Sequence, residues 1–100
     1  MEKLTLLFEE FLQKAMLMTE AFLANDFTIE TNFEGFTSNR ERLFAIMDQI
    51  SEQITWDEVA NERRAELNRQ VEYIKKLDDQ LLAKLEAYQQ EVRSEIGEAC

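Results

Sequence analysis

The sequence predicts an all-α protein, specifically an antiparallel three-helix bundle with a long C-terminal helix. The composition favours helix throughout, because 100 residues contain 2 Gly and no Pro and are rich in Leu, Glu, Gln, Ala and Arg. Apolar residues also recur at steps of three and four along three successive stretches. We expect a single helical domain over residues 1–100, with helices at about 2–23, 28–54 and 57–96 joined by short links.

The first expected helix carries a wide apolar face. Its seam alternates steps of four and three through Leu4, Phe8, Phe11, Ala15, Met18 and Phe22. The face is widened by Leu7, Leu12, Met16 and Leu23. A face this wide usually contacts two neighbouring helices. We therefore expect this helix to be the main contributor to the core. If Phe11 is fully buried, Phe11→Ala should cost about 3–5 kcal/mol. The alternative is that part of the face forms a binding surface.

The second expected helix keeps the same spacing without a break. Its seam consists of Ile29, Phe33, Phe36, Arg40, Leu43, Met47, Ile50 and Ile54. Asp26 or Thr28 can cap its start by accepting a hydrogen bond from a free backbone N–H. Gly35 and residues 37–39 are poor helix formers. A local kink or a frayed first half is therefore expected, although the continuous heptad favours helix.

The third expected helix is the longest. Thr55 and Glu58 fit the S/T-x-x-E capping box at its start, and Gly97 is a candidate for its C-terminal end. Its seam runs through Leu67, Val71, Ile74, Leu81, Leu85, Tyr88, Val92 and Ile96. Helices of about 22, 27 and 40 residues cannot match in length. The third should outrun its partners by about eight to twelve residues, or roughly 12 to 18 Å.

The end of this long seam is the predicted partner-binding surface. Its residues are Leu81, Leu85, Tyr88, Val92 and Ile96. Large uncovered apolar patches on soluble proteins usually mark interaction sites. A sister subunit or a fold-back of the helix is the alternative cover for the seam.

Two charged residues interrupt the seams, Arg40 in the second helix and Asp78 in the third. A charge in a seam is costly unless it is paired. We expect Arg40 and Asp78 to face each other as a structural pair. The alternative is that each charge reaches water at the edge of the bundle.

Composition disfavours several functional classes. The chain has no His, no pair of Cys and no Gly-rich loop, so we expect no catalytic residues, no metal site and no cofactor. A net charge of −10 disfavours nucleic acid and anionic membrane surfaces as partners. No apolar run is long enough to span a membrane, and the N-terminus does not look like a signal peptide. Cys100 has no internal partner, so the expected location is cytoplasmic.

Three segments resemble the flagellar type III export chaperones of the FliT kind. They are Leu23 to Phe27 (LANDF), Arg40 to Met47 (RERLFAIM) and Ile74 to Glu86 (IKKLDDQLLAKLE). The likeness covers roughly Leu12 to Ile96 and lies in the helix lengths, the Arg-rich second helix and the Leu-Asp of the long helix. It implies a small cytoplasmic bundle that binds the filament-cap protein or another secretion client and delivers it to a component of the export apparatus. The alternative is a homodimeric helical structural or adaptor protein.

Overall fold

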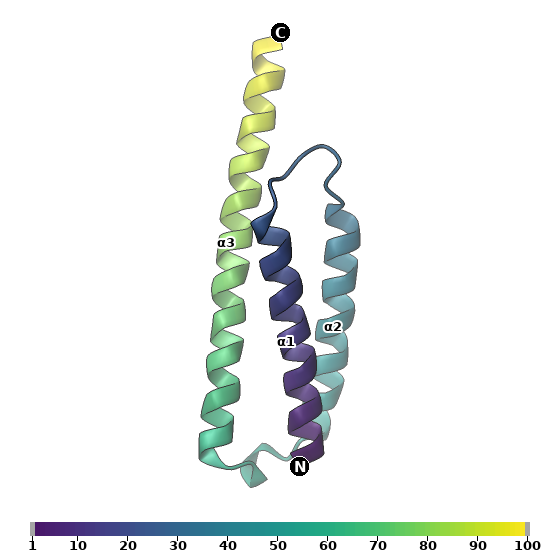
Figure 1. Cartoon of the computed structure of the whole chain (residues 1–100), viewed down its shortest axis with the longest axis vertical. Helices are drawn as coiled ribbons and strands as arrows, with labels where there is room; N and C mark the ends of the chain where they lie inside the picture. The colour runs from purple at the N-terminus through teal and green to yellow at the C-terminus, as the bar shows by residue number, and fades with distance from the viewer. Residues whose placement is uncertain (1, 100) are drawn as a thin grey trace.

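The computed structural model describes the backbone of residues 2–99 and the side chains of residues 2–94. This part of the chain forms three α-helices and one 3-10 turn and contains no strand: α1 (Glu2–Ala24), α2 (Phe33–Gln53), η1 (Trp56–Glu58) and α3 (Asn61–Ala99). The helices run up, down and up, and α3 extends well past the others (Figure 1). The predicted fold, an all-α antiparallel three-helix bundle with a long C-terminal helix, is therefore confirmed.

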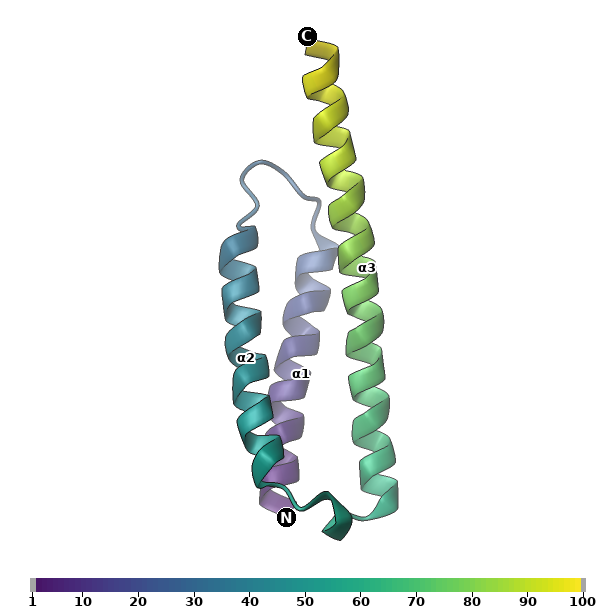
Figure 2. The ribbon, with the colours of Figure 1, turned by 180° about the vertical axis from the view of Figure 1, so that it is seen from behind.

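The central helix of the bundle is α1. Its backbone packs closely against both α2 and α3, whereas α2 and α3 come close to each other at few points. Figure 1 shows α1 in front of the two flanking helices, and the view from behind shows it between them at the back (Figure 2). The bundle is elongated, with extents of 62 × 21 × 18 Å. The side of α2 and α3 that faces away from α1 is consequently left open.

The buried stripe of α1 includes two threonines. Its members are Thr5, Phe8, Leu12, Ala15 and Thr19. The hydroxyl of Thr19 donates to the carbonyl oxygen of Ala15 at 2.8 Å, and that of Thr5 to Glu2 at 2.9 Å. Both polar groups are thus satisfied within their own helix, and the methyl groups remain free to pack. Phe11 lies beside this stripe and is partly exposed, so the loss of about 3–5 kcal/mol for a fully buried ring does not apply to it.

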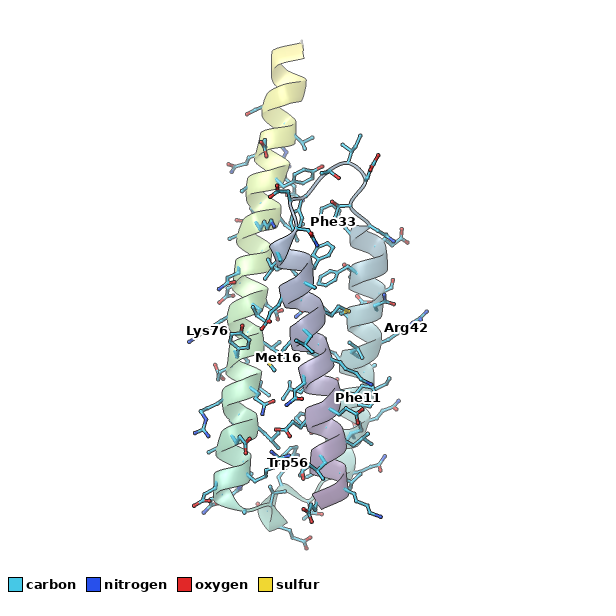
Figure 3. The ribbon with its side chains drawn as sticks, viewed as in Figure 1. Phe11, Met16, Phe33, Arg42, Trp56 and Lys76 are labelled. Carbon is cyan, nitrogen blue, oxygen red and sulfur yellow. The ribbon has the colours of Figure 1, made fainter. Side chains whose placement is uncertain are left out.

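The core is concentrated at the end of the bundle where α1 begins, α2 ends and α3 begins, which we call the aliphatic end. Its buried side chains are mostly aliphatic: Phe8, Leu12, Met47, Ile50, Ile54, Val59, Leu67 and Ile74. The ring of Trp56 packs against this core beside the first turns of α1, edge-on to Phe8 with 5.7 Å between ring centroids (Figure 3). The opposite end, where α1 ends and α2 begins, we call the aromatic end.

The start of α2 differs from the prediction. The helix begins at Phe33 rather than at residue 28, because side chains of the preceding loop bond to nearby backbone. Thr31 Oγ1 accepts from the backbone N–H of Thr28 at 2.8 Å, and this local bonding competes with helix. Asn32, not Asp26 or Thr28, is the N-cap, and its Oδ1 accepts from the N–H of Gly35 at 2.9 Å.

Glycine suits position 35 because the capping side chain folds over it. A Cβ there would lie 2.9 Å from Cγ of Asn32, closer than such contacts normally come. Gly35 is therefore part of the N-terminal cap, and α2 is a single helix from Phe33 to Gln53.

The start of α3 also differs. Thr55 and Glu58 do not open the long helix: the N–H of Glu58 donates to the carbonyl oxygen of Thr55 at 2.9 Å and closes the single turn η1. The helix α3 then begins at Asn61 and continues through the position of Gly97 to Ala99. The later start of α3 places the beginning of α2 beside a later part of α3. Phe33 lies beside Tyr88, with 5.9 Å between ring centroids.

Candidate functional site

An apolar groove lies between α2 and α3 at the aromatic end. Its cavity volume is about 520 Å³, within the usual range for ligand-binding clefts. The lining comes from all three helices: Phe22 from α1, Phe33, Phe36, Thr37, Arg40, Glu41 and Phe44 from α2, and Leu81, Leu85, Tyr88 and Gln89 from α3. A second hollow of about 210 Å³ follows further down, lined by Phe44, Met47 and Asp48 of α2 and by Val71 and Ile74 of α3, among others.

The upper part of the groove is built on an aromatic cluster, which we define as Phe22, Phe27, Phe33, Phe36 and Tyr88. Phe22 of α1 stacks on Phe36 of α2 with 3.9 Å between ring centroids and an interplanar angle of 6°. Phe27, from the loop, meets Phe33 edge-on at 5.0 Å and Tyr88 at 6.0 Å. All five side chains are partly exposed. Aromatic rings held together in this state are frequent anchors of protein interfaces.

Lys84 of α3 fixes the loop that carries Phe27. Its Nζ donates to the carbonyl oxygen of Leu23 at 2.7 Å and also to that of Asn25. These carbonyl groups lie at the C-terminal end of α1, where free acceptors and the negative end of the helix dipole favour a cation. The same ammonium lies 4.5 Å from the ring centroid of Phe27. One side chain therefore ties the end of α1, the loop and α3 together.

Arg40 and Asp78 meet across the groove. The guanidinium of Arg40 donates to Oδ1 of Asp78, and only 15% of the Arg40 side chain is exposed, against 44% for Asp78. The guanidinium carbon also lies 5.0 Å from the ring centroid of Phe44 and 6.0 Å from that of Phe36, which is a favourable cation–π arrangement. The structure thus brings together the two charges that interrupt the apolar seams and joins α2 to α3 through them.

The five predicted partner-binding residues divide into four groups. Leu81 lines the inner part of the groove, but it is only 8% exposed, so it is not an uncovered seam residue. Leu85 and Tyr88 are partly exposed and line the groove. They lie beside α2 and its preceding loop rather than beyond the bundle, because α3 begins late. Val92 is partly exposed above them. The side chain of Ile96 lies outside the described residues.

The α2 side of the groove and Lys84 are parts of the site that the sequence pattern does not predict. The seam spacing predicts Phe33 and Phe36 only as packing residues and gives no role to Thr37 or Glu41. One available signal was the clustering of aromatics, since four of the seven Phe residues fall between positions 22 and 36. Nothing in the sequence predicts the role of Lys84, because a lysine on a long helix is ordinarily exposed to solvent.

A separate polar cluster holds α3 to α1 at the aliphatic end. The carboxylate of Glu9 accepts from both terminal nitrogens of Arg63 at 3.0 and 3.1 Å and from Nε2 of Gln70 at 2.7 Å. The hydrogen bonds from Arg63 and then from Gln70 hold the pKa of Glu9 below its usual range, and the bonds to Glu9 raise the pKa of Arg63. The cluster is a bidentate clamp between helices. None of its three residues lines the upper cavity or the lower hollow.

The described side chains contain no group of three or more His, Cys, Asp or Glu residues that could hold a metal ion. Among the described residues no helix is both long and apolar enough to cross a membrane. The groove offers apolar surface bordered by charged side chains, and such a surface can bind a partner non-covalently.

The fold and the groove define a small all-α bundle with an apolar surface cleft between two of its helices. No family model, no curated protein and no solved structure matches this chain. Its function therefore has to be argued from the groove itself.

Proposed function

We propose that this chain is a cytoplasmic export chaperone that binds a flagellar secretion client, keeps it soluble and passes it to the export apparatus. The client implied by the resemblance is the filament-cap protein. In this proposal an amphipathic helix of the client lays its apolar face in the groove between α2 and α3, a common way of recognising helical segments. Binding is stoichiometric, and the protein performs no covalent chemistry.

The observation that carries the proposal is the aromatic groove on an otherwise acidic molecule. A chain with a net charge of −10 stays soluble through its charged surface, yet it leaves a cluster of aromatic rings partly exposed. If a partner buried these rings, each Å² of apolar area removed from water would contribute roughly 25 cal/mol to the free energy of binding, before the costs of association are subtracted.

The shape of the groove favours a helix over a small molecule. The upper cavity of about 520 Å³ and the lower hollow of about 210 Å³ follow one another along α2, which is 21 residues long. A helix of that length spans roughly 30 Å. A bound helix can lie alongside α2 over that distance, completing a four-helix arrangement on the side that α1 leaves open.

The test uses two tryptophan variants at neighbouring exposed positions of α2. Thr37 lines the groove, whereas the side chain of Ser38 points about 100° away from it. We expect Thr37→Trp to fill the groove and weaken binding of purified filament-cap protein by about tenfold or more in calorimetry. Ser38→Trp, the matched control, should bind as the unmodified chain does. Equal binding by both variants would overturn the groove as the site, and no binding by the unmodified chain would overturn this client.

One observation supports a second candidate, a homodimeric structural or adaptor protein. The last part of α3 extends beyond the ends of α1 and α2 (Figure 1), and two copies could pair along it. Light scattering separates the two candidates. A dimer would show twice the mass of 11.8 kDa, and it would persist when Thr37→Trp fills the groove.

A further inference from the structure

One rim of the groove carries a regular row of carboxylates. Glu34, Glu41 and Asp48 follow one another along α2 at intervals of seven residues, and a seven-residue step returns to nearly the same face of a helix. Glu41 lines the upper cavity and Asp48 lines the lower hollow. Glu34 lies one step earlier in the row, at the start of α2. The row therefore follows the whole length of the groove.

These carboxylates are not neutralised within the described part of the chain. All three are exposed, and none forms an ion pair with another described residue. Other exposed acids do have such partners, as with Glu66 and Arg63 or Glu72 and Lys75.

The two arginines of α2 do not offset the row. Arg40 is matched by Asp78, and Arg42 points away from the groove on the outer side of the helix (Figure 3).

The opposite rim of the groove, on α3, has a different character. Leu82, Leu85 and Gln89 form one row at steps of three and four, and Leu85 and Gln89 line the cavity. Leu82 is 58% exposed. The charge of this row is Asp78, four residues before Leu82, and it is matched by Arg40. A helix lying in the groove therefore meets an acidic border on α2 and a mainly apolar border on α3.

From this asymmetry we infer that the occupant of the groove is a partner helix with an apolar stripe and a row of Lys or Arg residues, spaced by seven, along the side that faces α2. The inference rests on the proposed function and specifies its client chemically. Opposite charges at the borders of a helical seam set partner choice and orientation, as e and g residues do in coiled coils. A second copy of this chain fits poorly, because it would bring a further charge of −10 to the acidic rim.

The test compares two designed peptides of about 18 residues, roughly 27 Å as helices. They share one Leu/Phe stripe, and one carries Lys and the other Glu at the three flanking positions. Titrated into the full chain at low salt, the Lys peptide should bind at least about tenfold more tightly than the Glu peptide. The preference should shrink at about 0.3 M salt, because exposed charges are then screened.

Two charge-matched variants locate the source of the preference. The triple variant Glu34→Gln, Glu41→Gln, Asp48→Asn removes three charges from the rim. The control triple Asp57→Asn, Glu62→Gln, Asp79→Asn removes the same number from exposed positions that do not line the groove. The rim variant should lose most of the preference for Lys, and the control should keep it.

Each other outcome overturns a stated part of the account. Equal binding of the Lys and Glu peptides would refute the basic partner while leaving the groove as a binding site. If both triple variants lost the preference for Lys equally, the preference would come from the net charge of the chain rather than from the rim. That result would also refute the inference. Failure of both peptides to bind at all would refute the helix-binding groove itself and with it the proposed function.

Discussion

The two ends of the bundle bury different kinds of side chain to different depths. At the aliphatic end Leu12 is 1% exposed and Leu67 is 2% exposed, and Trp56 packs against this core. At the aromatic end Phe22 stacks on Phe36 and Phe33 lies beside Tyr88, but these rings stay partly exposed. The same three helices therefore form a densely buried core at one end and an open cleft at the other.

This difference in burial indicates that one end of the bundle provides most of the stability and the other provides a surface for binding. A domain of this size has only about 5–15 kcal/mol of total stability, and the buried aliphatic core can supply much of it. The aromatic end is then free to keep apolar area exposed. Polar clamps hold each end in place: Glu9 with Arg63 at the aliphatic end, and Lys84 with the end of α1 at the aromatic end.

A pair of leucine substitutions should show the largest effect. Leu12→Ala removes a fully buried side chain at the aliphatic end and should lower the free energy of unfolding by about 2–5 kcal/mol. Leu85→Ala removes the same atoms from the partly exposed groove and should cost about 1 kcal/mol, since only part of its apolar area leaves water on folding. Denaturant unfolding of both variants measures the contrast. Equal losses would erase the distinction between the two ends.

The ion pair between Arg40 and Asp78 should show an intermediate effect. Asp78→Leu leaves the mostly buried guanidinium of Arg40 without its partner and should cost about 1–2 kcal/mol, less than a fully buried pair because Asp78 is nearly half exposed. The double variant Arg40→Leu, Asp78→Leu should cost less than the sum of the two single variants. Strict additivity in this double-mutant cycle would mean that the two side chains do not interact in solution.

The smallest effect concerns pH at the aliphatic end. Hydrogen bonds from Arg63 lower the pKa of Glu9 in the folded state, so folding favours its ionised form. The stability from this group is therefore present above the ordinary carboxyl pKa, and it is lost as pH falls through the lowered pKa of the folded state. Thermal unfolding between about pH 6 and pH 3 should be less pH-dependent in Glu9→Gln than in the unmodified chain.

Glu10→Gln is the matched control for this pH effect, since Glu10 is exposed and pairs only loosely with Lys14 at 3.6 Å. It should leave the pH dependence almost unchanged. A Glu10 effect as large as that of Glu9 would contradict the role of the clamp.

The sequence predicted the helix number, the long C-terminal helix and the facing positions of Arg40 and Asp78, because heptad spacing reports which residues share a face. It misplaced the start of α2, since Ile29 continued the heptad by coincidence and is 94% exposed in the loop. Local bonding by Thr28, Thr31 and Asn32 outweighed that pattern. Spacing alone could not predict such competition between side chain and backbone.

The site was predicted only on one side. Leu85 and Tyr88 were identified from the seam of α3, but their neighbours on α2 depend on the register between helices. That register is set by the turn η1 and the late start of α3 at Asn61. A shift of a few residues moved Tyr88 from an expected overhang into the aromatic cluster. Element boundaries, not element types, therefore limited the prediction of the groove.

The central claim is that the groove between α2 and α3 binds a helix, while the turn η1 and the start of α3 at the aliphatic end maintain the fold. Amide hydrogen exchange of the full chain, with and without the Lys-flanked peptide, tests it most directly because binding suppresses local opening at the contact surface. We expect slower exchange in residues 33–48 and 81–89, which border the groove, and unchanged exchange in residues 55–67, which line neither of its two cavities. Slowing confined to the aliphatic end, or spread evenly over all three helices, would contradict the claim.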